Sequence, residues 1–305
     1  METLLPELLR SLVSGLLMGL VFALVALGLT VIFGVMDVVN FAHGEFLMIG
    51  MYTTLILAPL LGVDPLLTLP LAGLVGAALG VACYFGVVKF LLRGPMVAQL
   101  LGTFGLMLVL RNLALLFMGS EPRTVNKGIL VGKSWLVGPG VVLESTKLAA
   151  AVLSIASFVA VWWLIRRTKT GLALTATSLD KEGARYVGIS TERMNALSWA
   201  IGGASVAIAG GLLVNFWPVD PNVGLLFTMI AFATVALGGF GSIRGAFLAG
   251  ILIGLIVYVP PVWDAITNFA GVDWISIHSF KYTFVYIVYF LIMVFRPRGL
   301  FGWKQ

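Results

Sequence analysis

Charged residues are scarce in this chain of 305 residues: they make up 10% of it, whereas hydrophobic residues make up 60%. Soluble domains carry about 25% charged residues, so the composition excludes an ordinary soluble globule. Residues 11–36 and 46–63 contain no charge at all. Uncharged runs of about 20 residues match the thickness of the hydrocarbon core of a bilayer. The sequence therefore predicts an all-α, polytopic helical membrane protein.

Cysteine and the usual catalytic motifs are also nearly absent. The single cysteine, Cys83, lies in a hydrophobic run and is interpreted as an apolar packing residue. We find no Cys/His metal cluster, no H-E-x-x-H and no G-x-S-x-G. Residues 128–134 approach a phosphate loop, but three residues separate the two glycines where four are needed. We therefore expect no metal site, no cofactor bound by this chain and no enzymatic activity of its own.

Long apolar segments divide the chain into membrane spans within a single transmembrane domain, residues 1–305. A polar string at the start of the second span leaves two alternatives there: a continuous span, or a broken or re-entrant helix near residues 34–50. The expected count is thus about nine, within a range of eight to ten. The predicted spans are residues 11–33, 42–63, 65–88, 95–118, 148–165, 195–217, 222–240, 245–260 and 278–295.

Basic residues are unevenly divided between the two sets of loops. Twelve lie in one set and six in the other, with Arg111 left inside a span. Loops on the cytoplasmic side carry the excess of lysine and arginine. This predicts an external N-terminus and a cytoplasmic C-terminus. Residues 166–194 are then the main cytoplasmic loop, and residues 119–147 are the main external loop.

Glycines with three residues between them occur in several spans and predict close crossings of helices, because small residues let backbones approach. The pairs are Gly15 and Gly19, Gly76 and Gly80, Gly241 and Gly245, and Gly250 and Gly254.

Asp37, Asn40, His43 and Glu45 form a short polar string between two uncharged runs. If residues 37–43 are helical, the first three share an arc of about 120° and Glu45 falls on another face. One interpretation is that the string lines a substrate path or a gate, with His43 able to couple protons. The other is interfacial: Asp37 caps a helix at the surface and Glu45 is solvated.

Arg111 is the one basic residue inside a predicted span. Three interpretations stay open for it: contact with a substrate carboxylate, an interhelical partner, or a tilt toward the interface.

A second polar segment, residues 179–189, lies in the predicted cytoplasmic loop and is expected to be helical. Its Glu-Gly-Ala-x3-Gly pattern resembles the Glu-Ala-Ala-x3-Gly loop of ABC importer permeases, with glycine at the second position. In that family the loop forms a short helix that docks on an ATPase subunit. A small side chain would allow close docking, and the last glycine would let the chain turn away. The candidate coupling residues are Asp180, Glu182, Gly183, Ala184, Arg185 and Gly188.

With both segments in view, most of the chain resembles the permeases of branched-chain amino acid and amide or urea ABC importers, and more narrowly their H-type permease. Residues 28–46, 170–189 and 236–246 carry the resemblance most specifically. The family implies an importer in a bacterial inner membrane, and the charge distribution then places the N-terminus in the periplasm. It also implies a second permease, two cytoplasmic ATPase subunits that use ATP, and a periplasmic binding protein that sets most of the specificity.

A proton-coupled secondary transporter that uses Asp37, His43 or Glu45 is the alternative. The docking-type loop argues against it. A membrane-embedded enzyme is the third class, and no constellation of nucleophile or metal ligands supports it.

Overall fold

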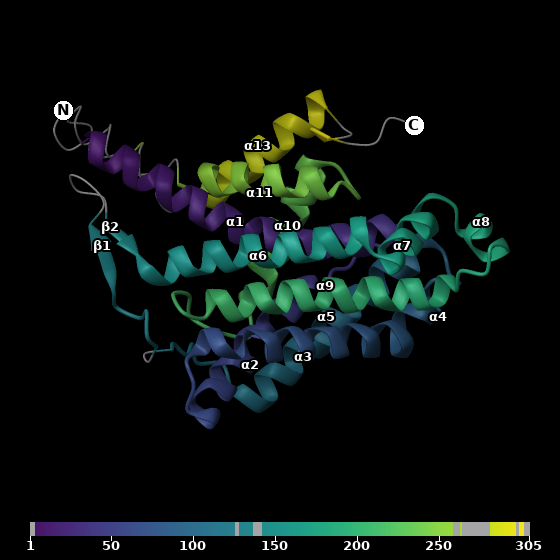
Figure 1. Ribbon diagram of the computed structural model, residues 1–305, viewed down its shortest axis with the longest axis horizontal. Helices are drawn as coiled ribbons and strands as arrows, with labels where there is room; N and C mark the ends of the chain where they lie inside the picture. Colours follow the sequence, from purple (N-terminus) through teal and green to yellow (C-terminus); the bar gives the residue numbers. More distant parts are fainter. Residues whose placement is uncertain are drawn as a thin grey trace.

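Long helices lie roughly along one axis of the molecule, and a short β-hairpin sits at one end (Figure 1). The computed structural model describes residues 4–125, 128–136, 142–258, 263, 281–296 and 299–301. The elements are α1 (Leu4–Met36), α2 (His43–Leu61), the 3₁₀ helix η1 (Pro65–Thr68), α3 (Leu69–Cys83), the π-helix η2 (Tyr84–Val88), α4 (Lys89–Leu91), α5 (Met96–Met118), β1 (Ser134–Leu136), β2 (Val142–Glu144), α6 (Ser145–Arg167), α7 (Lys169–Leu179), α8 (Lys181–Tyr186), α9 (Thr191–Leu213), α10 (Val223–Gly238), α11 (Ile243–Val257) and α13 (Lys281–Phe295).

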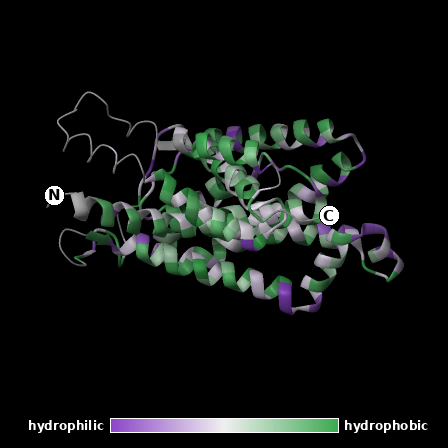
Figure 2. Cartoon of the chain, turned by 90° about the horizontal axis from the view of Figure 1, so that it is seen from above, coloured by the Kyte–Doolittle hydropathy of each residue, from purple (hydrophilic) through white to green (hydrophobic). Residues whose placement is uncertain are grey.

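The helices confirm the prediction of an all-α polytopic membrane protein. Six helical stretches of the described chain are long and apolar enough to cross a membrane. Three further apolar helices, at Val223–Gly238, Ile243–Val257 and Val285–Phe295, are shorter. The number of spans therefore stays a prediction. Hydrophobic residues cover the middle of the bundle, and most hydrophilic segments lie toward its ends (Figure 2).

The core lies around α1, α2, α9 and α10. Trp199 of α9 is fully buried, and its ring centroid lies 6.1 Å from that of Phe46 in α2. Phe22 of α1 packs in the same way against Phe227 of α10, at 6.3 Å. Helices α5 and α6 instead expose most of their apolar side chains. They form the periphery, where lipid or another subunit is the natural neighbour.

Two glycine pairs make the predicted close crossing between α1 and α11. A Cβ added to Gly15 would lie 3.0 Å from the Gly254 carbonyl oxygen, and one added to Gly19 would lie 2.7 Å from Ile251 Cα. No larger residue fits there without moving one backbone. Gly250 likewise faces the backbone of α1. The crossing glycines of these two helices are confirmed.

The other two pairs have different outcomes. A Cβ on Gly76 or Gly80 of α3 would overlap the α9 backbone, at Gly203 and Trp199 respectively, so that crossing is confirmed. Gly241 has a φ of 77° and lies in the turn between α10 and α11. Gly245 of α11 does approach α10 closely, since a Cβ there would overlap the Gly238 carbonyl oxygen. Gly241 serves a left-handed turn instead, so the prediction that both glycines form one crossing is wrong.

The two ends of the bundle differ. One end carries the N-terminus and the hairpin, in which Ser134 pairs with Glu144 and Leu136 pairs with Val142. The opposite end carries α7 and α8 (Figure 1). The two loops predicted on opposite sides of the membrane, residues 119–147 and 166–194, thus lie at opposite ends of the molecule.

Candidate functional site

The polar string lies at a helix break and not on one helix. Helix α1 ends at Met36, α2 begins at His43, and the residues between them are non-helical. Asp37 has a φ of 58° and is the one non-glycine residue with a positive φ in the described chain. The predicted arc that joins Asp37, Asn40 and His43 on one helix face is therefore wrong. Aspartate tolerates this left-handed conformation, which diverts the chain at the end of α1.

Asp37 stands apart from the rest of the string. Its side chain is 76% exposed and lies 3.6 Å from Lys181 Nζ, at the start of α8. The same ammonium donates a hydrogen bond to the Met36 carbonyl oxygen at 3.3 Å. A cation at the C-terminal end of a helix opposes the negative end of the helix dipole. Lys181 thus connects the end of α1 to α8.

Asn40 and His43 are buried and hold the start of α2. Asn40 Oδ1 accepts a hydrogen bond from the Ala42 N–H at 3.0 Å, while its Nδ2 has no partner among the described residues. His43 Nε2 lies 2.9 Å from the carbonyl oxygen of Val25 in α1, so this nitrogen carries the proton. Gly28 makes room for the ring, because a Cβ there would lie 3.0 Å from His43 Cε1.

Glu45 and Arg111 form a buried ion pair between α2 and α5. Arg111 Nη2 donates to Glu45 Oε1 at 2.6 Å, and the two side chains are 14% and 0% exposed respectively. The interpretation of Glu45 as a solvated residue is therefore wrong. Of the alternatives for Arg111, the interhelical partner is confirmed. Glu45 Oε2 and Arg111 Nε have no hydrogen-bond partner within the described chain. The pair thus keeps one acceptor and one donor unused.

Two threonines that sequence reasoning missed complete this region. The Gly44 N–H donates to Thr228 Oγ1 of α10 at 2.9 Å, and that hydroxyl donates to the Gly224 carbonyl oxygen. Thr103 Oγ1 of α5 donates to the Val39 carbonyl oxygen at 3.0 Å. Both satisfy backbone groups of the break and the first turn of α2. Their signal in the sequence is a hydroxyl within an otherwise apolar span.

The second candidate segment, residues 179–189, contains the helix α8 (Lys181–Tyr186), so the prediction of a helix there is confirmed for its central residues. Asp180 Oδ1 caps this helix by accepting from the N–H groups of Glu182 and Gly183, both at 3.0 Å. A Cβ on Gly183 would lie 2.5 Å from Asp180 Oδ2, which gives a local reason for glycine at this position. Gly188 has a φ of 84° and ends the segment in a left-handed turn, as predicted.

Ala184 does not have the orientation that was expected of a docking residue. It is 4% exposed and packs within the chain, whereas Tyr186 and Val187 are 87% and 76% exposed. Its small size therefore serves the packing of α8 against its own chain. Arg185 is exposed, and its Nε donates to Thr191 Oγ1 at 3.0 Å. The exposed face of this segment includes Glu182, Tyr186 and Val187.

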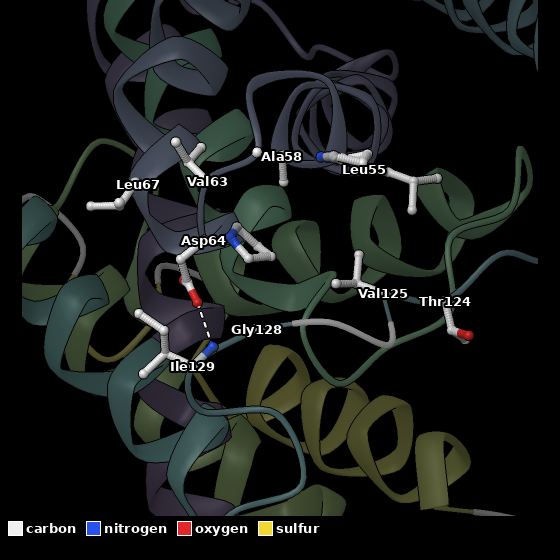
Figure 3. A pocket seen from close by; sticks show the side chains of 12 residues that line it. Leu55, Ala58, Val63, Asp64, Leu67, Thr124, Val125, Gly128 and Ile129 are labelled. Atoms are coloured by element: carbon white, nitrogen blue, oxygen red, sulfur yellow. Dashed lines mark hydrogen bonds between the residues drawn. The ribbon is translucent and has the colours of Figure 1, made fainter.

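A cavity of about 1070 Å³ lies away from both segments, between the end of α2 and the loop that precedes the hairpin (Figure 3). Asp64 lies in its wall. Its carboxylate accepts from the N–H groups of Leu66 at 2.9 Å and Ile129 at 2.6 Å. The acid thus anchors the loop before the hairpin. No group of three or more potential metal ligands occurs among the described residues.

The described chain is thus a polytopic helical protein with a buried ion pair beside a helix break and a capped helix at one end. The chain belongs to the family described as branched-chain amino acid transport system / permease component, whose sequence model matches residues 11–295.

Three relatives illustrate the similarity. The high-affinity branched-chain amino acid transport system permease protein LivH of Salmonella typhimurium is 32% identical, over 96% of this chain and 95% of its own. The permease protein BraD of the corresponding Pseudomonas aeruginosa system is 30% identical, over 97% of each chain. A probable LivH of Methanocaldococcus jannaschii is 31% identical, over 76% of this chain and 74% of its own. No solved structure matches the chain.

Proposed function

We propose that this chain is the membrane-spanning permease subunit of an ATP-driven, binding-protein-dependent importer. It moves branched-chain amino acids or related small polar solutes across the membrane by alternating access. The observation that carries this proposal is the family match over residues 11–295, together with relatives that align over nearly their whole length. Because no ATP-binding loop is found in the sequence, separate ATPase subunits supply the energy.

The proposed assembly contains a second permease subunit, two cytoplasmic ATPase subunits and a periplasmic substrate-binding protein. The chain lies in a bacterial inner membrane with its N-terminus periplasmic and its C-terminus cytoplasmic. The distribution of basic residues supports this orientation. The ATPase then meets the end that carries α8, and the binding protein meets the end that carries the hairpin.

The coupling segment is proposed to act through α1. Glu182, Tyr186 and Val187 in and after helix α8 are exposed. Lys181, the first residue of α8, donates a hydrogen bond to the last residue of α1. Helix α1 in turn holds His43 through the Val25 carbonyl oxygen. A displacement of α8 by the ATPase would therefore reach the start of α2 through contacts that are present in the structure.

The translocation path is proposed to pass beside Asn40, Glu45 and Arg111. Each has an unpartnered polar atom in the described chain, and together they offer two donors and one acceptor. A zwitterionic amino acid presents a carboxylate and an ammonium, which need groups of both kinds. His43 positions this group, and Asp37 belongs to the coupling connection. Proton coupling finds no support here, because Glu45 is ion-paired, His43 is tied to a backbone carbonyl and Asp37 is exposed.

Reconstitution tests the proposal. The chain is purified with the subunits that accompany it, placed in liposomes that enclose ATP, and supplied with its binding protein and labelled leucine. We expect uptake that requires enclosed ATP and survives collapse of the proton gradient by an uncoupler. Uptake by the chain alone, abolished by the uncoupler and independent of ATP, would refute the proposal. A labelled amide and urea, tested in parallel, discriminate among the substrate classes.

A further inference from the structure

Two cavities adjoin where α6 and α11 meet, at the end of the bundle that carries α7. The first, of about 420 Å³, lies among α1, the α6–α7 corner and the α10–α11 turn. The second, of about 360 Å³, is a groove between α6 and α11. They share Ile243 and Arg244, so the groove continues into the pocket.

The pocket is positively charged. Thirteen residues line it, among them Arg166 and Arg244 but no aspartate or glutamate. Neither guanidinium has an ion pair or a side-chain hydrogen bond with another described residue, and both residues are exposed. The hydroxyl of Ser242 also lines the pocket, where it caps α11 by accepting from the Gly245 N–H at 3.1 Å. Two arginines without a carboxylate among the lining residues give the pocket a positive field that favours an anion.

The groove is apolar and faces outward. Apart from Arg244, its lining residues are apolar, from Ile155 and Trp162 on α6 to Phe247 and Leu248 on α11. Val159 and Leu248 in its walls are 52% and 47% exposed. A second apolar hollow extends the same surface along α6. In a membrane protein this surface meets acyl chains, and Trp162 lies one turn before Arg166, where aromatic residues mark the edge of the bilayer.

We propose that this surface binds one anionic phospholipid, whose phosphate group lies between Arg166 and Arg244 and whose acyl chain lies in the α6–α11 groove. Guanidinium groups bind phosphate oxygens in a bidentate manner. The pocket lies on the side with the excess of basic residues, which is the side where basic pockets between helices meet anionic head groups. A free phosphate ion would leave the apolar groove without an occupant. The inference goes beyond transport, although it uses the proposed membrane orientation.

The test measures lipid retained by the assembled importer after purification in mild detergent from native membranes. Lipid is quantified by native mass spectrometry and by extraction, and rebinding of a short-chain phosphatidylglycerol is titrated on the delipidated complex. A double variant, Arg166→Gln with Arg244→Gln, removes the two charges proposed to bind the head group. A second variant, Val159→Trp, fills the groove proposed to hold the acyl chain. Arg167→Gln, at a neighbouring arginine outside the pocket lining, and Leu74→Trp, at an exposed site of α3, are the matched controls.

We expect one anionic phospholipid per chain in the unaltered complex. The double arginine variant should bind phosphatidylglycerol about 30-fold more weakly, since each basic residue near the surface contributes about 1 kcal/mol. Val159→Trp should also weaken binding, and both controls should leave it unchanged. Phosphatidylcholine should not compete.

Three results would overturn the inference. The first is equal retention in the double arginine variant and in Arg167→Gln. The second is saturable binding of inorganic phosphate that Val159→Trp does not alter, together with no binding of the lipid, which would indicate a simple anion site. The third is loss of a protein subunit from the double arginine variant with no change in bound lipid, which would indicate a subunit contact. None of these readouts depends on transport, so failure here is distinct from failure of the proposed function.

Discussion

Arg111 Nη2 of α5 lies 2.6 Å from Glu45 Oε1 in the first turn of α2, and Glu45 is fully buried. Removal of one partner leaves the other charge buried without compensation, which costs about 3–5 kcal/mol. We expect Glu45→Gln and Arg111→Met each to lower the stability of the purified complex. The double variant should lose less than the sum of the two single losses, because it leaves no unpaired charge.

Thermal unfolding of the three variants measures this coupling, and ATP-dependent uptake measures function. If the pair lines the path, the double variant recovers stability but not uptake. Lys147→Met is the control, because its pair with Glu144 is partly exposed and should contribute at most about 1 kcal/mol. Strictly additive losses in the double variant would contradict the buried pair.

Gly44 gives a second prediction, because a Cβ at this position would overlap the Gly224 carbonyl oxygen of α10. Gly44→Ala should therefore force α2 and α10 apart and cost about 1–3 kcal/mol or more. Gly105→Ala in α5 is the matched control, since no atom lies within 4 Å of its added Cβ. The midpoint of thermal unfolding should fall for the first variant only. Equal midpoints for both would show that the two helices are not in contact at Gly44.

Periodicity and composition predict the helices, because apolar runs of membrane length leave few alternatives to them. Glycine spacing likewise predicts the α1–α11 crossing. The Glu45–Arg111 pair could not be predicted, since 66 residues separate its members and a buried charge in one span does not identify its partner. A broken helix near residues 34–50 was one of two alternatives left open by the sequence, and the structure has the break, but the conformation of Asp37 was missed. Its left-handed backbone depends on packing at both helix ends, and aspartate is equally compatible with a helical turn.

Substitutions of Asp37 can test its left-handed backbone conformation separately from its charge. Asparagine also tolerates a φ of 58°, whereas a β-branched residue does not. We expect Asp37→Asn to keep the stability of the complex, because its contact with Lys181 is exposed and 3.6 Å long. Asp37→Val should lose about 1–3 kcal/mol through backbone strain. Equal unfolding midpoints for the two variants would refute the left-handed conformation.

The surface of α8 gives the last prediction. Tyr186 and Glu182 are exposed, so alanine at either position should leave the unfolding midpoint unchanged. If α8 docks on the ATPase, both variants should lose ATP-dependent uptake while the ATPase subunits keep their basal hydrolysis. Leu136→Ala, at a residue that is 75% exposed in the hairpin at the opposite end, should keep uptake. Ala184→Trp should behave differently from all three, because Ala184 is buried within its own chain and a large side chain there disrupts packing before it can affect docking. Normal uptake in both the Tyr186 and Glu182 variants would exclude this face of α8 as the ATPase contact.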